Sequence, residues 1–404
     1  MAITFDPEGK TYSDGITTLA LNADGVYVIN TIEELKLFRD AVNARNSFRG
    51  QSVKLMTSLN LNNEEWTPIG RNGAVFQGTF DGNGQTISNL KITKGLDNTP
   101  ENCGIGFFGY TNSPARITNL TIDNVDITGS LYVGAIVGNG FTGAEISNCH
   151  VTGQIEIEGW WYIGGIGGNG YVSKVDNCTV TGDEGSYIKA LNSGSYVGGI
   201  WGFRGEGNMV ISDCTVDNID ITGYDRTGGI CGIAHYQNTI QGCSITNSSI
   251  TAASNAGNIG LIAGANLGRL TADNGKPAGP TILLNNTVDV ETKEHFTLEG
   301  QVPENPPMLG ENDHMGDPGK AAIVGDVTLN EAGEITGGTI TVVGTEKDNV
   351  DVNSKLDFVE GFQAYPTGDG TLEVDETGYV ASANGTRYKS LSEAITAAGA
   401  GGTV

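Results

Sequence analysis

A short glycine-rich segment with an isoleucine or phenylalanine two residues before its closing glycine recurs six times along the chain, which strongly limits how the chain can fold. Typical copies read Tyr-Ile-Gly-Gly-Ile-Gly-Gly at 162–168 and Tyr-Val-Gly-Gly-Ile-Trp-Gly at 196–202. Successive copies are about 30 residues apart, a period typical of solenoid proteins. The glycines that close the six copies are Gly109, Gly138, Gly168, Gly202, Gly232 and Gly264.

A second phrase repeats in step with the first. Each copy begins with a residue that tolerates a left-handed backbone, and an apolar, polar, apolar alternation follows. Two phrases in register, with strands but no helical pattern between them, predict one coil of a right-handed parallel β-helix per repeat. The fold class is therefore expected to be all-β. The opening residues of the six copies are Asn119, Asn148, Asn177, Asp213, Gly242 and Asn285.

Equivalent residues of successive coils should stack about 4.8 Å apart, so each sequence column becomes a ladder in space. Two columns are predicted to face inward: Phe107, Ile136, Ile166, Ile200, Ile230 and Ile262 in the first, and Leu120, Cys149, Cys178, Cys214, Cys243 and Asn286 in the second. The cysteines of this ladder are interpreted as free, buried thiols rather than disulfides. Cys103 and Cys231 lie outside the ladder and are also expected to be unpaired.

Composition narrows the possible partners. The 404 residues include 61 glycines and only 4 tryptophans, and 47 acidic against 22 basic residues give a formal net charge of −25. Such a surface repels nucleic acid and anionic membranes. No long apolar run is present, so no membrane insertion is expected for these residues.

Five regions can be distinguished. An N-terminal cap with a helix over 31–46 is expected at 1–46, the β-helix at 47–295, and a loop or linker rich in proline and acidic residues at 296–320. Further coils or a small β module should occupy 321–380, and 381–404 should begin a second, truncated β-helix module. Capping boxes at Thr31–Glu34 and Ser390–Glu393 mark the two helices. The residues Gly401–Val404 have the pattern of a strand that is starting, so we expect a piece of a longer chain whose export and anchoring signals lie outside it.

The run Gly-Thr-Phe-Asp-Gly-Asn-Gly-Gln-Thr-Ile-Ser-Asn-Leu at 78–90 follows Trp-Thr-Pro-Ile-Gly at 66–70 and precedes the glycine repeats. This arrangement resembles the GLUG-motif surface proteins of bacteria. The resemblance, over about residues 26–290, implies an exported, modular protein with a right-handed parallel β-helix. In that family the β-helix serves as stalk, adhesive face or accessory module, sometimes beside a protease domain. No His-Glu-x-x-His protease motif is present here.

Catalytic and metal-binding patterns are sparse. Parallel β-helices include polysaccharide-cleaving enzymes that use paired carboxylates or calcium. The carboxylates of this chain are interpreted as a solvated strand face, and no catalytic residue is assigned. No cofactor is expected. A structural Ca²⁺ at Asp81–Gly84 or Asp313–Asp317 is the weaker alternative to a glycine-rich turn. The carboxylates in question are Asp123, Asp126, Glu156, Glu158, Asp217 and Asp220.

Aromatic residues of the middle coils give the best binding signal, because flat rings on a rigid face can stack on sugars or anchor a protein partner. The candidate ligand-binding residues are Trp160, Trp161, Tyr171, Trp201, Tyr224 and Tyr236. A further column, Tyr132, Tyr162 and Tyr196, is ambiguous. Strict alternation points these rings inward, whereas a bend at the glycine pair would point them outward, and internal stacking is slightly favoured.

These observations favour a non-enzymatic, extracellular module of a bacterial cell-surface adhesin. It would bind a host glycan or a host surface or secreted protein, or act as a rigid stalk, and would be monomeric within a larger multidomain chain. Two alternatives remain. One is a polysaccharide lyase or glycoside hydrolase of the β-helix class, and the other is a phage-type fibre or spike.

Overall fold

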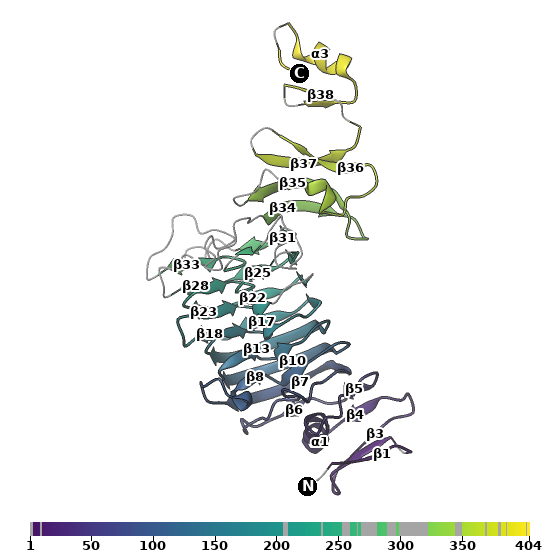
Figure 1. The fold of residues 1–404 in the computed structure, drawn as a ribbon, viewed down its shortest axis with the longest axis vertical. Coiled ribbons are helices and arrows are strands. Elements are labelled where there is room, and N and C mark those ends of the chain that lie inside the picture. The colour runs from purple at the N-terminus through teal and green to yellow at the C-terminus, as the bar shows by residue number, and fades with distance from the viewer. Residues whose placement is uncertain are drawn as a thin grey trace.

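The protein is elongated, with its two ends at opposite poles of a stacked β-structure (Figure 1). The structure is a computed structural model. It describes residues 3–8, 10–204, 209–235, 237–252, 259–264, 266–267, 281–288, 296–298, 322–343, 350–367, 370–378, 381–384, 386–400 and 402–404. Within these residues no helix is both long enough and apolar enough to cross a bilayer.

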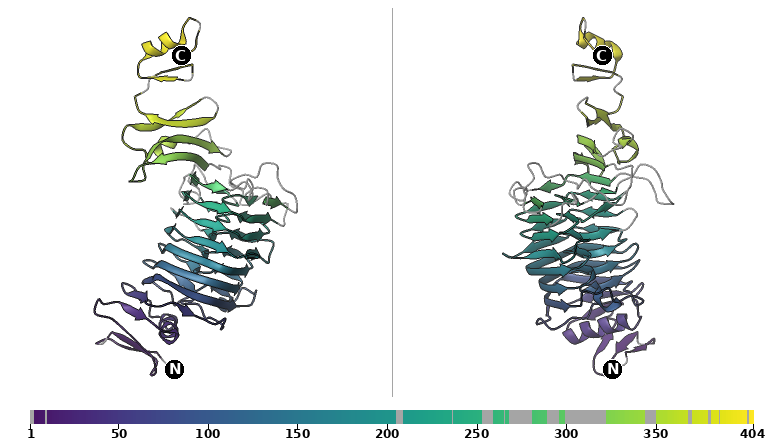
Figure 2. Two further views of the ribbon diagram at one scale, coloured as in Figure 1. Left: turned by 180° about the vertical axis from the view of Figure 1, so that it is seen from behind. Right: turned by 60° about the vertical axis from the view of Figure 1, so that its left-hand side comes forward.

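The central part is a parallel β-helix, as predicted, and its coils stack along the long axis of the molecule (Figure 2). The largest sheet, here called sheet 1, runs along one side. In the first coils it consists of the short strands β5 (Ser52–Leu55) and β6 (Leu59–Asn60), followed by the long strands β7 (Thr79–Thr93), β10 (Arg116–Thr128) and β13 (Glu145–Gly159).

In later coils each long strand is replaced by three short ones that pair in parallel with their counterparts in the coil before. These are β16 (Lys174–Asp176), β17 (Thr179–Gly182) and β18 (Tyr187–Ala190); β21 (Val210–Ser212), β22 (Thr215–Asp217) and β23 (Asp220–Gly223); β26 (Thr239–Gln241), β27 (Ser244–Thr246) and β28 (Ser249–Ala252); and β31 (Thr281–Leu284), β32 (Thr287–Val288) and β33 (Phe296–Leu298).

The bends within sheet 1 lie where the sequence predicts them. All six turn residues have a positive φ, for example 54° at Asn119 and 62° at Gly242. Asparagine side chains also bond from coil to coil. Asn148 Nδ2 donates to Asn119 Oδ1 at 2.7 Å, and Asn177 Nδ2 donates to Asn148 Oδ1 at 3.2 Å. The column is thus both a set of left-handed corners and a hydrogen-bonded ladder.

Two smaller sheets complete each coil. Sheet 2 contains β8 (Cys103–Ile105), β11 (Leu131–Gly134), β14 (Tyr162–Gly164), β19 (Tyr196–Gly198), β24 (Arg226–Gly228) and β29 (Ile259–Gly260). Sheet 3 contains β9 (Phe108–Thr111), β12 (Val137–Gly140), β15 (Gly167–Gly170) and β20 (Trp201–Arg204). Beyond it, β25 (Ala234–His235) pairs with β30 (Asn266–Leu267).

The glycine-rich segment forms the bend between sheets 2 and 3. Its closing glycine packs against the backbone of sheet 2 in the preceding coil. A Cβ added to Gly168 would lie 2.3 Å from the Val133 amide nitrogen, and one added to Gly202 would lie 2.4 Å from that of Ile163. Only glycine permits this approach, which explains why the residue recurs once per coil.

Both predicted inward columns are confirmed as core, except that Asn286 at the end of the second is half-buried and bonds to the Cys243 and Ile240 backbone. All six residues of the isoleucine and phenylalanine column are fully buried. In the second column Leu120, Cys149, Cys178 and Cys214 have no exposed surface and Cys243 has 1%. All six cysteines of the chain are buried and free. The ladder therefore behaves as a row of small apolar side chains.

A helix covers the N-terminal end of the core. Helix α1 (Ile32–Asn43) begins after Thr31, whose side chain accepts from the Glu34 amide, and the Glu34 side chain bonds back to Thr31. Its stripe of Leu35, Phe38 and Val42 is fully buried. The strands β1 (Thr4–Asp6), β2 (Thr11–Ser13) and β3 (Thr18–Ala20) form a small antiparallel sheet, and β4 (Tyr27–Ile29) pairs with β5.

The C-terminal part starts from the solenoid and then changes character. Strand β34 (Ala322–Leu329) pairs in parallel with β31, whereas β35 (Ile335–Val343), β37 (Thr371–Glu376) and β36 (Phe362–Pro366) continue antiparallel. A hairpin of β38 (Ala381–Ala383) and β39 (Thr386–Tyr388) follows. Helix α3 (Leu391–Ala398) begins at Ser390, whose side chain accepts from the Glu393 amide.

Candidate functional site

An aromatic stack lies on the outer side of sheet 2. In each strand of this sheet the residue after the tyrosine is core: Val133, Ile163 and Val197 are fully buried. Because successive side chains of a strand point to opposite faces, the tyrosines before them point away from the core. Tyr196 also belongs to a separate apolar cluster with Ile233 rather than to the solenoid core.

The expectation that Tyr132, Tyr162 and Tyr196 stack inside the solenoid is therefore wrong about the side, although the rings do stack. The bend at the glycine pair explains the difference. Gly199 and Ile200 form a bend between β19 and β20, so the alternation does not continue through them. Counting back from the buried isoleucine by twos then gives the wrong face for the tyrosine.

The stack has regular geometry. The ring centroids of Tyr132 and Tyr162 are 5.5 Å apart with planes 13° from parallel, and those of Tyr162 and Tyr196 are 5.1 Å apart. Arg226, the next residue of the same column, places its guanidinium 4.6 Å from the Tyr196 ring centroid. Phe203 from sheet 3 contacts both Tyr162 and Tyr196, at 4.9 and 5.1 Å.

Sequence reasoning missed Arg226 and Phe203 as members of this stack. Arg226 could have been found, because Arg-Thr-Gly-Gly-Ile at 226–230 aligns with Tyr-Val-Gly-Gly-Ile at 196–200. Phe203 comes from another sheet, so its contact with Tyr162 depends on the angle between sheets 2 and 3. No spacing in the sequence specifies that angle.

Tyr132 has an unusual backbone. Its φ is 62°, in the left-handed region that bulky residues avoid. The preceding member of the column is Gly104, with φ 70°. A side chain at Gly104 would also collide with the Tyr110 ring, 2.1 Å from the added Cβ. The first coil thus meets the same backbone requirement with glycine, whereas the second coil keeps a tyrosine despite its conformational cost.

Burial and charge tune the hydroxyl groups of the stack. Burial raises the pKa of Tyr162 to about 12, the neighbouring Tyr196 and Tyr132 hydroxyls add to this rise, and Arg226 opposes it. Arg226 is itself only 5% exposed and pairs with Asp225 at 2.5 Å. The Tyr162 hydroxyl therefore stays protonated over the physiological range, and the charge of Arg226 is paired with that of Asp225.

Two of the predicted ligand-binding rings are exposed, and one of them contacts the stack. Trp161 is 39% exposed and meets Tyr162 edge to face at 5.9 Å. Tyr171 is 44% exposed, and its hydroxyl contributes to the raised pKa of Tyr132, after burial and Cys103. Trp160 is half-buried in the turn before β14. Tyr224 is half-buried, packs against the solenoid core, and its amide donates to Ser195 Oγ at 3.2 Å.

Trp201 was expected to be exposed, and this is wrong. It has no exposed surface, and its Nε1 donates to the Phe203 carbonyl oxygen at 3.0 Å. The indole fills space left by Gly167 in the preceding coil, where an added Cβ would lie 2.0 Å from the ring. Ile200 and Trp201 both face inward because the bend between sheets 2 and 3 separates them. Tyr236 lies outside the described residues.

The six carboxylates considered for catalysis lie along sheet 1. Asp126 and Glu156 are in register on neighbouring coils, and Asp126 pairs with Lys91 at 2.6 Å. Thr152 and Thr246 donate to Asp123 and Asp217 in the same way across coils. These contacts are those of a solvated strand face with cross-coil bonds.

Asp81, the first residue of one candidate calcium site, already makes hydrogen bonds and an ion pair within the protein. Its Oδ1 accepts from the Asn83 amide at 2.8 Å and from Asn119 Nδ2 at 3.0 Å, and its Oδ2 lies 3.4 Å from Lys54 Nζ. Across the part of the chain that the structure describes, no group of three His, Cys, Asp or Glu residues is placed to hold a metal ion. The other candidate, Asp313–Asp317, lies outside that part.

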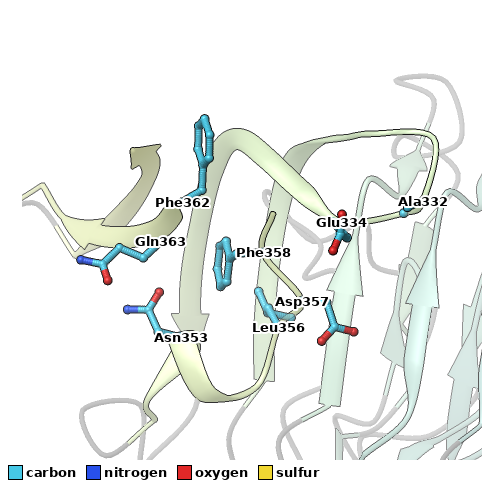
Figure 3. A pocket seen from close by; sticks show the side chains of 9 residues that line it. Ala332, Glu334, Asn353, Leu356, Asp357, Phe358, Phe362 and Gln363 are labelled. Atoms are coloured by element: carbon cyan, nitrogen blue, oxygen red, sulfur yellow. The ribbon is translucent and has the colours of Figure 1, made fainter. Parts of the chain in front are cut away.

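A cavity of about 510 Å³ lies in the C-terminal β region (Figure 3). Phe358 and Phe362 form apolar parts of its lining, and Glu334 and Asp357 supply two carboxylates. Glu334 accepts from Asn330 at 2.9 Å. Asn353 Nδ2 donates to the Ala364 carbonyl oxygen at 3.1 Å and its Oδ1 accepts from the Ala364 amide at 2.7 Å, which holds the two segments together.

Comparison with known proteins supports the assignment of the repeat. Residues 129–156, which run from before β11 into β13, match the GLUG motif. The chain carries the GLUG motif. The matched stretch contains Tyr132 of the stack and the buried Ile136 and Cys149, so the motif corresponds to one coil of the solenoid.

Two relatives extend this comparison. Over 209 residues the chain is 29% identical to Halomucin of Haloquadratum walsbyi, a match covering 50% of this chain but 2% of Halomucin. A crystal structure from Bacteroides ovatus, assigned provisionally as an immunoglobulin A1 protease, superposes with a TM-score of 0.50 and 17% identity. That match covers 72% of this chain and 82% of the other, and it shows a shared fold alone.

Proposed function

We propose that this protein is a GLUG β-helix module of an extracellular, cell-surface protein of bacteria, and that it binds glycans through the edge of its aromatic stack. The observation that carries the proposal is the placement of Trp161 and Tyr171. Trp161 is 39% exposed and Tyr171 is 44% exposed, and Trp161 contacts the Tyr162 ring of a stack that is fixed by strand register.

The chemistry of this surface suits saccharides. Sugar rings have an apolar face that packs on aromatic rings, and a rigid aromatic surface loses little conformational entropy on binding. The module would also hold this surface away from its attachment point, because the solenoid extends in one direction (Figure 1). The likeness to Halomucin supports a large modular parent protein.

A glycan array tests the proposal with Trp161→Ala and Tyr171→Ala variants. We expect each variant to lose binding at least tenfold, the scale of one stacking contact, with little change in thermal stability. Binding of the unaltered protein should persist at high salt, because stacking is not screened. The control is Phe5→Ala, which removes a ring that is 42% exposed on the N-terminal sheet.

Equal binding by Trp161→Ala and the unaltered protein would place the site elsewhere. No glycan bound by the unaltered protein would favour a passive spacer or a protein partner. Release of reducing ends or unsaturated sugars from a polysaccharide would favour the enzyme alternative instead.

A further inference from the structure

A second cavity, of about 310 Å³, lies at the N-terminal end of the solenoid. It is enclosed by the end of α1, the segment around residues 67–72, the residues before β8, and β8 itself. Its volume is at the lower end of the range of about 300–1,000 Å³ typical of small-molecule sites. Its lining residues are Asn43, Thr67, Pro68, Gly70, Arg71, Asn72, Lys94, Pro100, Glu101, Cys103, Gly104 and Ile105.

The charge of this lining is opposite to that of the whole chain. Arg71 and Lys94 contribute two cations, and Glu101 is the one carboxylate among the lining residues. The chain as a whole carries a formal net charge of −25. A cationic cavity in an acidic protein concentrates anions locally, whereas the surrounding surface repels them.

Both cations have donors to spare. Arg71 Nε and Nη2 donate to the Asn43 carbonyl oxygen at 3.3 and 3.2 Å, which orients the guanidinium but uses two of its five donors. Lys94 Nζ lies 3.9 Å from Glu65 Oε1, beyond hydrogen-bond distance. That oxygen already accepts from the Thr93 amide at 2.7 Å.

The rest of the lining is of two kinds. Pro68, Pro100 and Ile105 provide apolar surface, and Thr67 and Asn72 provide hydroxyl and amide groups. A compact ring with one apolar face, several hydroxyls and one carboxylate would use all of them. From this combination we infer that the cavity binds a carboxylated sugar, with Arg71 and Lys94 holding the carboxylate.

The inference takes its ligand class, a saccharide, from the proposed function, but it concerns a different site. Gly104 lies between the cavity and the aromatic stack. It lines the cavity, and it precedes Tyr132 in the same column, where the Tyr110 ring covers it. An acidic sugar in the cavity would therefore be near the first rings of the stack. A glycan lying along the solenoid could reach both.

Cys103 offers a reporter inside the cavity. It lines the cavity and is 8% exposed, whereas the other five cysteines are at most 2% exposed. Burial raises the pKa of the Cys103 thiol, so alkylation is best followed at mildly alkaline pH. We expect iodoacetamide to modify Cys103 first in the native protein, as located by peptide mass.

The test compares glucuronate, glucose and acetate as protecting ligands. Glucuronate should slow Cys103 alkylation, glucose should not, and acetate should protect only weakly because it lacks the ring. Arg71→Gln and Lys94→Met should each weaken glucuronate binding about tenfold, the loss of one charge-assisted hydrogen bond. Lys54→Met, which removes a cation outside the cavity, should leave protection unchanged.

Three results would overturn the inference: no protection by glucuronate, equal protection by glucose, or equal protection by acetate. Isothermal calorimetry on the Cys103→Ser variant gives a measurement independent of the thiol, and thermal unfolding of each variant shows whether it is folded. Trp161→Ala should keep full protection of Cys103. The experiments would thus distinguish a cavity that does not bind glucuronate from an aromatic surface that does not bind glycans.

Discussion

At the scale of single residues, Tyr132 is the position at which the backbone and the side chain have opposing requirements. Its left-handed φ favours glycine, yet its ring stacks on Tyr162. Tyr162 occupies the same column in the next coil without a positive φ. The two tyrosines therefore form a matched pair in which the ring environment is similar and the backbone differs.

We expect the ranking of alanine and glycine to reverse between these two positions. At 132, glycine should be more stable than alanine by about 1–2 kcal/mol, because alanine retains the left-handed cost. At 162, alanine should be more stable than glycine by about 0.5–1 kcal/mol. Urea unfolding of the four variants measures both differences. The same ranking at both positions would contradict the left-handed assignment of Tyr132.

At the scale of the element, the bend between sheets 2 and 3 requires that a large side chain in one coil packs against a small residue in the neighbouring coil. Gly167 and Trp201 are partners in register, and the indole occupies the space above the glycine. Gly167→Ala should therefore destabilise the protein by about 1–3 kcal/mol or more through overpacking. Gly194→Ala is the control, since no atom lies within 4 Å of the added Cβ, and it should change stability by less than about 0.5 kcal/mol.

Trp201→Val should partly relieve the Gly167→Ala defect, so the double variant should cost less than the sum of the two single variants by about 0.5–3 kcal/mol in urea unfolding. Strict additivity would mean that the two residues do not share one space.

This bend also marks the limit of what the sequence could predict. The inward Ile166 and Ile200, the left-handed Asn148 and the buried cysteines all follow from period and residue type, and the structure confirms them. Trp201 and Tyr196 do not, because alternation is counted along a strand and the glycine pair interrupts the strand. The partners of the stack from sheet 3 depend on an angle between sheets, which arises only when the coil closes.

At the scale of the whole molecule, residues that are far apart in the sequence lie close together because the coils stack in register. Ser88, Asp123, Thr152, Thr181, Asp217 and Thr246 form one column in register on sheet 1. The same stacking of coils brings Tyr132, Tyr162 and Tyr196 into contact. The aromatic stack and the proposed binding surface both depend on it.

Pulsed dipolar spectroscopy on spin-labelled cysteine pairs tests this stacking most directly. In a Cys103→Ser background, labels at Ser88→Cys and Thr246→Cys are separated by five coil spacings, roughly 24 Å, and labels at Thr152→Cys and Thr246→Cys by three, roughly 14 Å. We expect one narrow distance for each pair, with the first longer than the second by about two spacings. Broad distributions, or a difference far from two spacings, would contradict the parallel β-helix and the aromatic stack that depends on it.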